Sequence, residues 1–253
     1  EPLGERLRGL VRMFMGDLVR AEADVKRALE RRSDYAEAHC VLGTVLDQSG
    51  RLDDALAEFR KSLEQDPDMV LALLFYGDGL RRQGQYDEAV KWLSRAIALA
   101  PQFTEAYISR GASLCVLGEL RQARMDLDEA IAQGADDARI YLSRGLVHQL
   151  QGRSDEALED YTRVIAVKPF SDAGYVMRAR LQAAAGSPVA APRDLDVASR
   201  LVPRSAQVHF ERGLVHTSLG LWKEAVDDYT RAVQLRPGFT EALVNRGSLL
   251  AEH

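Results

Sequence analysis

Cysteine is scarce in this sequence of 253 residues, which contains only Cys40 and Cys115. Two cysteines cannot form the dense disulfide framework that is typical of small secreted proteins, so we expect a cytoplasmic rather than an exported protein. The sequence opens with EPLGER, which has neither a methionine nor an apolar stretch. We therefore expect a fragment or a processed form whose targeting signals are not on view.

Long apolar runs and basic clusters are missing as well. No uninterrupted apolar run approaches the length of about 18 residues that a membrane-spanning helix needs, so membrane insertion is not expected. The formal net charge is -5, and Lys and Arg form no basic tract. Because binding to phosphate backbones needs such tracts, a nucleic-acid partner is not expected either. The hydrophobic content of 46% still allows a sizeable core.

The sequence does contain a repeat with a period of 34 residues. We number the positions of one copy from 1 to 34, starting at residue 2. Glycine or alanine occupies position 8 in every copy, glycine occupies position 15, and alanine occupies position 20. Such a period predicts a repeat architecture, which we expect to form a single solenoid over residues 1–253. The predicted copies are 2–35, 36–69, 70–103, 104–137, 138–171, 172–205 and 206–239, followed by a terminal helix over 240–253.

Each copy is predicted to form two helices. Positions 4, 7, 8 and 11 make one amphipathic stripe, and positions 20, 24, 27 and 28 make a second. The glycine at position 15 favours a left-handed residue that ends the first helix. Aspartates at Asp53, Asp87 and Asp155 are candidate N-caps for the second helix. Stacking of neighbouring copies would bury what one helix pair leaves open.

Three stretches resemble a known repeat family. GRSDEALEDYTRVIAVKP (152–169) and GQYDEAVKWLSRAIALAP (84–101) are similar to the second half of the tetratricopeptide repeat, and AYISRG (106–111) is similar to its start. The resemblance extends over residues 2–253 without a break in register. It implies an all-α, right-handed superhelical solenoid of stacked antiparallel helix pairs, in which the first helices line a concave channel. It also implies that the protein holds other proteins and has neither an enzymatic activity nor a cofactor.

Copy 6 departs from the pattern. It carries Ala179 at position 8, Pro188 at position 17 and Pro192 at position 21. Proline is tolerated in the first turn of a helix, so we expect the second helix of this copy to begin near Val189 or Ala190. We also expect this copy to be the least stable.

Arginine at position 7 and aspartate at position 23 occur together. Every full copy with this arginine also has the aspartate, and the two copies without the arginine lack the aspartate. A guanidinium and a carboxylate match in a bidentate geometry, so we predict structural ion pairs between helices rather than arginines that grip an acidic ligand. Each arginine is predicted to pair with the aspartate of its own copy or with that of the preceding copy. The residues predicted to form these structural ion pairs are Arg8, Asp24, Arg110, Asp126, Arg144, Asp160, Arg178, Asp194, Arg212 and Asp228.

A second stripe on the first helices, at positions 2, 5, 9 and 12, is a candidate partner-binding face. Position 5 is apolar in seven successive copies, and charged residues interrupt the stripe. Two alternatives stay open: position 5 is covered between adjacent first helices, and the charges are simply solvated. The concave-face residues predicted to contact a partner are Cys40, Leu74, Asp78, Arg81, Arg82, Ile108, Leu142, Leu146, Val176, Arg180, Phe210 and Leu214.

The polar residues of this face limit the kind of partner. Family members that grip a peptide backbone or a terminal carboxylate use asparagines and lysines there, whereas the only asparagine in this chain is Asn245. We therefore expect a hydrophobic or helical segment of a partner protein.

No pattern for chemistry stands out. The sequence has no phosphate-binding glycine motif. His209 and His216 are seven residues apart, about 10.5 Å along a helix, which is too far for one shared metal without other ligands. We predict no catalytic, cofactor-binding or metal-binding residues. The function expected is a non-enzymatic scaffold for protein–protein interaction. The alternatives are an assembly or regulatory module of a larger enzyme, and a module that self-associates.

Overall fold

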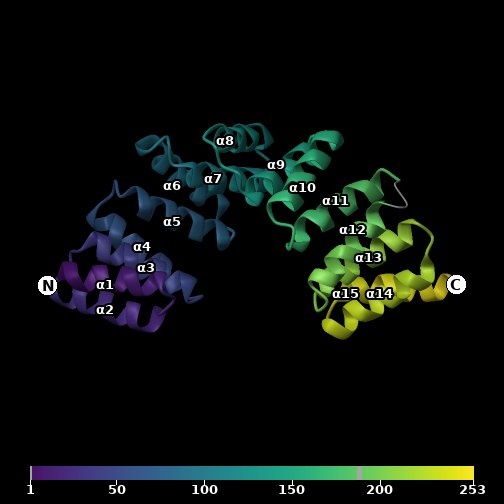
Figure 1. Cartoon of the computed structure of the whole chain (residues 1–253), viewed down its shortest axis with the longest axis horizontal. Coiled ribbons are helices and arrows are strands. Elements are labelled where there is room, and N and C mark those ends of the chain that lie inside the picture. The colour runs from purple at the N-terminus through teal and green to yellow at the C-terminus, as the bar shows by residue number, and fades with distance from the viewer. Residues whose placement is uncertain (1, 187–189) are drawn as a thin grey trace. The chain divides into compact units, whose positions relative to one another are not determined.

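A computed structural model describes residues 2–186 and 190–253, and its described elements are all α-helices (Figure 1). The chain divides into two compact units, which we call unit 1 (residues 1–135) and unit 2 (residues 136–253). Unit 1 contains α1 (Pro2–Phe14), α2 (Leu18–Arg31), α3 (Ala36–Gln48), α4 (Leu52–Gln65), α5 (Val70–Arg82), α6 (Tyr86–Leu99), α7 (Thr104–Val116) and α8 (Leu120–Ala132). Unit 2 contains α9 (Ala138–Leu150), α10 (Ser154–Val167), α11 (Asp172–Ala184), α12 (Ala190–Leu201), α13 (Ala206–Ser218), α14 (Trp222–Leu235) and α15 (Thr240–Glu252).

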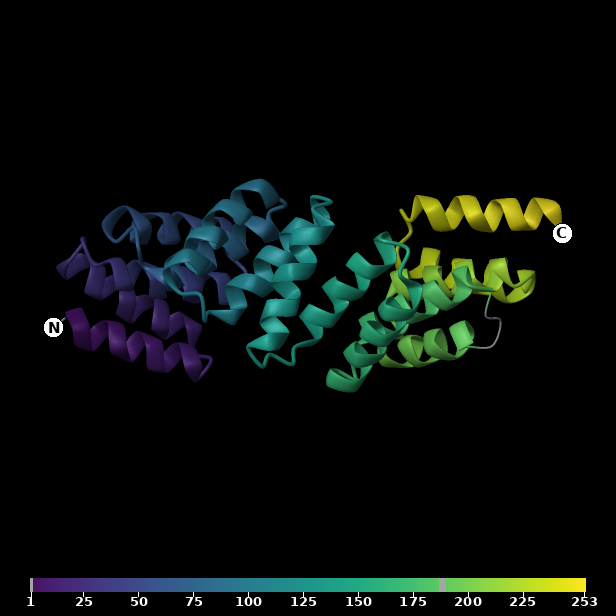
Figure 2. The same cartoon turned by 90° about the horizontal axis from the view of Figure 1, so that it is seen from above.

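The odd-numbered helices are the first helices of the copies, and they begin every 34 residues, from Pro2 to Thr240. Within each unit a first helix packs against its own second helix and against the second helix of the preceding copy. The all-α fold class of stacked helix pairs is therefore confirmed. Figure 2 shows the pairs from above, with α1 and α15 as the terminal helices of their units. A single domain over all residues stays a prediction.

The turns between paired helices follow the glycine at position 15. Gly16, Gly50 and their equivalents through Gly220 all have a positive φ, between 73° and 81°, as the sequence predicts. The N-cap prediction is wrong. The residues that precede α4, α6 and α10 are Arg51, Gln85 and Arg153, which make no side-chain cap bond. The three aspartates instead lie in the first helical turn, where their negative charge interacts favourably with the helix dipole.

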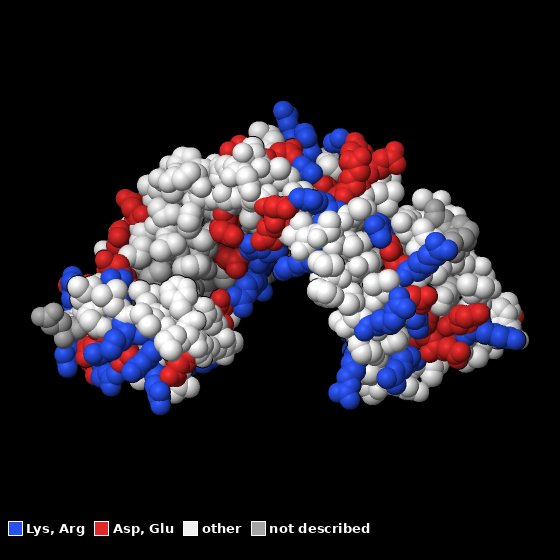
Figure 3. All heavy atoms as spheres, in the orientation of Figure 1, with Lys and Arg blue, Asp and Glu red and all other residues white. Residues whose placement is uncertain are grey.

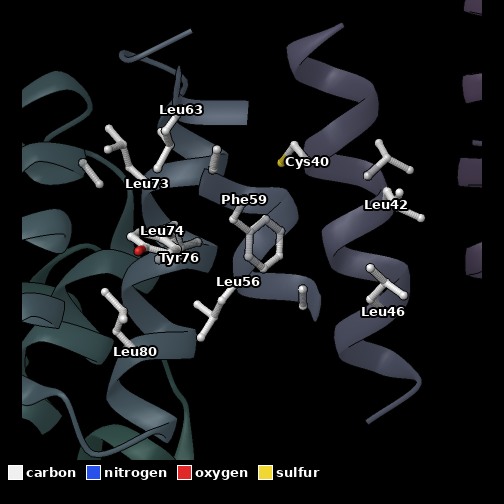
Figure 4. Packing of buried hydrophobic residues seen from close by; sticks show 14 of the residues in the cluster. Cys40, Leu42, Leu46, Leu56, Phe59, Leu63, Leu73, Leu74, Tyr76 and Leu80 are labelled. Carbon is white, nitrogen blue, oxygen red and sulfur yellow. The ribbon is translucent and has the colours of Figure 1, made fainter. Parts of the chain in front are cut away.

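Small residues at position 8 allow the paired helices to approach each other closely. A Cβ atom added at Gly43 would lie 2.5 Å from the ring of Phe59, and one added at Gly213 would lie 2.6 Å from the ring of Tyr229. Figure 4 shows Phe59 in the core of unit 1, among side chains from α3, α4 and α5. Packing of a large ring against a bare backbone therefore sets the spacing within a helix pair.

Copy 6 keeps this arrangement with alanine. Ala179 is fully buried, and α12 begins at Ala190, one of the two predicted starts. Val189 and Pro188 lie outside the described residues, whereas Pro192 lies in the first turn of α12. The low stability of this copy stays a prediction. Across the described ranges, no helix has the length and apolar character to cross a membrane.

Candidate functional site

The structure pairs four of the five predicted arginines with the aspartate of their own copy. Arg110 donates two hydrogen bonds to Asp126, both 2.7 Å long. Arg178 donates two to Asp194, at 2.7 and 2.8 Å. The same forked contact joins Arg144 to Asp160 and Arg212 to Asp228. The aspartates are buried, so each carboxylate has lost its water and accepts from the guanidinium instead.

Three of these arginines also contact the preceding copy within their unit. The Nη1 atom of Arg110 donates to Ser94, that of Arg178 to Thr162, and that of Arg212 to Asp196, at 3.0–3.1 Å. The partner lies at position 25 of the preceding second helix in each case. In these three copies the arginine at position 7 therefore joins a first helix to the second helices on both sides, so it stabilises the packing of the helices.

The prediction for Arg8 needs correction. Arg8 lies 3.9 Å from Glu5, and Asp24 accepts instead from Arg12 and Arg27. Arg12 is one helical turn further along α1 and reaches the same carboxylate.

The two copies without an arginine at position 7 use other contacts. In copy 2, Nδ1 of His39 lies 2.6 Å from Glu58. In copy 3, Tyr76 and Trp92 pack edge to face with their ring centroids 5.2 Å apart. The same site in the helix pair is therefore held by a polar contact in one copy and by an aromatic contact in the next.

The carboxylate of Asp228 in copy 7 has both an arginine and a histidine partner. Asp228 accepts from Arg212 at 2.6 Å, and Nδ1 of His216 lies 2.8 Å from it. Burial by itself would raise the pKa of Asp228, but the hydrogen bonds to His216 and Arg212 outweigh it, so the pKa lies below its ordinary value. Folding of this copy therefore favours an ionised aspartate.

In unit 1 the predicted apolar row at position 5 is closed, and this corrects its assignment as a partner-binding surface. Cys40, Leu74 and Ile108 are all buried, with exposed fractions of 6% or less. Cys40 and Leu74 pack in the core cluster shown in Figure 4. These buried side chains therefore stabilise the unit. Burial also raises the pKa of the Cys40 thiol to about 12, with a smaller contribution from Glu37.

The predicted charged residues of unit 1, Asp78, Arg81 and Arg82, all form contacts within the unit. Nε of Arg81 donates to Asp78 at 3.0 Å, and Ser109 on α7 donates to the same carboxylate oxygen at 3.0 Å. Arg82 donates to Asp47 on α3. These contacts link the first helices α3, α5 and α7.

In unit 2 the row is more open. At position 5, Leu142, Val176 and Phe210 are half-buried. At position 9 of the same face, Leu146 is half-buried and Leu214 is 37% exposed. Phe210 contacts Phe239 with a centroid distance of 4.7 Å, so part of its ring belongs to the core. Unlike in unit 1, apolar side chains of this row reach the surface.

A groove of about 230 Å³ lies between α11 and α13 in unit 2. It contains two of the predicted contact residues, Arg180 and Leu214. Nε of Arg180 lies 3.6 Å from Glu211, and the arginine side chain is 52% exposed. The groove is lined by Arg180, Ala183, Ala184, Glu211, Leu214, Val215 and Ser218.

The small side chains that line this groove were not predicted from the sequence. Positions 12 and 13 are Ala183 and Ala184 in copy 6, where other copies have larger side chains such as Gln149 and Leu150. That run of alanines was a usable signal. Glu211 was missed because it is buried at 6% exposure, at a position that is mostly apolar or small in other copies.

The surface and the titratable residues suggest no other kind of site. Figure 3 shows acidic and basic side chains interspersed over the visible face. Over residues 2–186 and 190–253, no three His, Cys, Asp or Glu side chains are grouped so as to hold a metal ion. The groove in unit 2 is therefore the candidate site.

Comparison with known proteins gives matches to one family. The family profile described as "Tetratricopeptide repeat" matches residues 6–69, 40–102, 110–173 and 176–238. A TPR repeat-containing thioredoxin from Arabidopsis thaliana is 36% identical over 83 residues, which are 33% of this chain and 22% of that protein. The chain thus matches about a fifth of that relative's length.

Solved structures share the fold. A tetratricopeptide repeat protein from Parabacteroides merdae superposes with a TM-score of 0.76 at 19% identity, over 98% of both chains. A chain of the APC/C hetero-tetramer Cut9–Hcn1 gives 0.79 at 18% identity, over 89% of this chain and 45% of that chain. YrrB, described as a TPR protein with an unusual peptide-binding site, gives 0.56 at 16% identity, over 75% and 97%.

Proposed function

The chain belongs to the tetratricopeptide repeat family, and from this premise we propose that it is a non-enzymatic scaffold for protein–protein interaction. We further propose that the first-helix face of unit 2 holds a hydrophobic or helical segment of a partner protein. The groove between α11 and α13 is the centre of that face.

The observation that carries this proposal is the chemistry of the groove. Ala183, Ala184 and Leu214 contribute apolar side chains to its lining, while Arg180 and Glu211 contribute a pair of opposite charges 3.6 Å apart. An apolar side chain of a partner would lose water on entering, and a polar residue beside it could bond to the exposed guanidinium of Arg180.

The arginines at position 7 are not part of the proposed site. Each of the four paired arginines already donates to a buried aspartate, so binding an acidic ligand would require breaking that contact. Related folds support the general role: one neighbour comes from a hetero-tetramer, and the description of another mentions a peptide-binding site.

A second candidate function is an assembly or regulatory module of a larger enzyme. The relative described as a TPR repeat-containing thioredoxin favours it, because such repeats there belong to a protein named as a thioredoxin. In that case, too, the groove of unit 2 would hold a protein segment. Self-association, a cytoplasmic location and the lack of a nucleic-acid partner stay predictions.

A comparative pulldown tests the proposed site. Leu214→Glu places a charge in the groove, whereas Leu150→Glu makes the same substitution at a side chain that is 58% exposed on α9, outside the groove lining. We expect Leu214→Glu to lose partners that the wild type and Leu150→Glu retain, with unchanged circular dichroism melting for both variants. Equal retention by all three proteins would refute the groove.

A further inference from the structure

Glu211 is an unexpected residue in the lining of the unit 2 groove. Its side chain is only 8% exposed, and it occupies a position that is mostly apolar or small in the other copies. A buried carboxylate costs free energy unless hydrogen bonds and an opposite charge compensate for the lost water. The contacts of its two oxygen atoms therefore determine what the groove can bind.

Only one carboxylate oxygen of Glu211 accepts a hydrogen bond within residues 2–186 and 190–253. Oε1 accepts from Nε2 of Gln207 at 3.0 Å. Oε2 lies 3.6 Å from Nε of Arg180, which is beyond hydrogen-bond distance. Oε2 can therefore accept a hydrogen bond from a bound segment.

The guanidinium of Arg180 has unused donors as well. Its side chain is 52% exposed, and in the part of the chain that the structure describes its one polar contact is the long approach to Glu211. The four paired arginines at position 7 differ, because each donates to a buried aspartate. Arg180 and Glu211 thus present N–H donors and a carboxylate acceptor side by side, with opposite charges that cancel.

This neutral pair disfavours a charged residue of a partner. An acidic side chain could bond to Arg180, but it would bring a second carboxylate close to Glu211. A lysine or arginine of the partner could bond to Glu211, but Arg180 would repel it. Either charge therefore gains one contact and suffers one repulsion.

A carboxamide matches both members of the pair. Its carbonyl oxygen accepts from the guanidinium and its NH₂ group donates to the carboxylate, so no net charge is added. Asn and Gln recognise the neighbouring donor and acceptor of adenine by the same two-point contact. A hydroxyl would have to use one oxygen atom for both bonds, whereas a carboxamide separates its acceptor from its donor.

We propose that the groove selects an asparagine or glutamine in the partner segment, beside the apolar side chain that packs against Ala183, Ala184 and Leu214. In a helical segment the two residues lie three or four positions apart, so that both face the groove. This specificity rests on the proposed function, because it concerns the polar contact made in the same groove.

A displayed peptide library tests this specificity. A helical host peptide keeps one leucine fixed, and the positions three and four residues before and after it are randomised. The library is sorted on the full chain, and clones that also bind the Leu214→Glu variant are discarded. We expect Asn and Gln to be enriched at one randomised position at least about fivefold over acidic and over basic residues, because a charged residue leaves one member of the pair without a partner.

Two substitutions should change the selected residue in opposite directions. Glu211→Gln keeps an acceptor for Gln207 and leaves Arg180 as the only charge, so acidic residues should be enriched. Arg180→Ala leaves the carboxylate alone, so lysine and arginine should be enriched. The matched controls Arg153→Ala and Glu156→Gln alter a pair on α10 outside the groove lining and should leave the preference unchanged. Circular dichroism melting checks folding, and Glu211→Gln alone decides the question if Arg180→Ala does not fold.

Four results would overturn this specificity: enrichment of a charged residue by the wild type, no preference at any randomised position, an unchanged preference after Glu211→Gln, or no binders at all. The first three leave the proposed function standing, because every counted clone depends on Leu214, and the fourth leaves it to the pulldown. A library whose binders all bind Leu214→Glu equally well would instead refute the groove as the binding site.

Discussion

The first helices of the two units differ in how far they bury the apolar residues at position 5. In unit 1 the apolar row at position 5 is sealed, with Ile108 only 3% exposed. In unit 2 the equivalent residues Leu142, Val176 and Phe210 are half-buried. The same position of one repeat can thus serve the core in one unit and reach the surface in the other, so repeat position alone does not identify a binding residue.

The contacts between paired helices differ in parallel. Copies 2 and 3 of unit 1 lack the Arg–Asp pair and share one large apolar core cluster. Each full copy of unit 2 has the pair, and the described apolar clusters there are smaller. The ion pair alone does not open the row, because copy 4 combines the Arg110–Asp126 pair with a buried Ile108.

The largest expected loss of stability comes from removing a buried ion pair in unit 2. Asp160→Ala leaves the guanidinium of Arg144 without its buried carboxylate and should reduce the free energy of unfolding by about 3–5 kcal/mol. Arg144→Ala should also destabilise, and the double variant should cost clearly less than the sum of the two single variants. Urea unfolding of the four proteins measures this coupling energy. Additive effects would contradict a structural pair.

A smaller change in stability is expected at the glycines, and its sign should depend on the space around each one. Gly213→Ala forces a methyl group toward the ring of Tyr229 and should destabilise by about 1–3 kcal/mol. At Gly247 of α15 an added Cβ atom meets nothing within 4 Å, so Gly247→Ala should stabilise by about 0.5–1 kcal/mol through helix propensity. Thermal unfolding with opposite signs for the two variants is the expected result. A stabilising Gly213→Ala would show that the spacing is not set by this contact.

Acid should distinguish the ion-paired copy 7 from the aromatic copy 3. The pKa of Asp228 is lowered in the folded chain, so its contribution to stability is full above the ordinary carboxyl pKa of about 3.9 and is lost as the pH falls through the folded value. The Tyr76–Trp92 contact has no carboxylate to protonate. As the pH falls below about 4, the backbone amides of α13 and α14 should therefore lose protection against hydrogen exchange before those of α5 and α6. The reverse order would contradict this.

The smallest effect is expected at an exposed pair. Nζ of Lys91 lies 2.6 Å from Glu88, but both side chains are well exposed on α6. Lys91→Ala should change the free energy of unfolding by no more than about 0.5 kcal/mol. A loss comparable to that of Asp160→Ala would mean that burial does not control the strength of these pairs.

The repeat period revealed most of the fold. Glycine at position 15 and small residues at position 8 act through the local backbone and the nearest helix, which sequence spacing describes well. The Arg–Asp pairing was visible because the two residues change together between copies. Arg8 escaped this reasoning because Arg12, one turn further along α1, reaches the carboxylate of Asp24 instead.

The candidate site was harder to predict. Burial of Cys40 and Leu74 depends on how closely adjacent first helices approach, which the size of several side chains decides together. The groove arises where Ala183 and Ala184 leave space beside Leu214, so it depends on residues from two copies. The alanines of α11 could indicate the small side chains of the groove but not the residues of α13 that complete it.

Photo-crosslinking from matched positions tests most directly whether the first-helix face of unit 2, and not that of unit 1, holds the partner. A photoreactive phenylalanine analogue replaces Leu214 in one protein and Asp78, also at position 9, in the other. The proposed function predicts a crosslinked partner from residue 214 at far higher yield than from residue 78. Equal yields, or a crosslink from residue 78 alone, would contradict it.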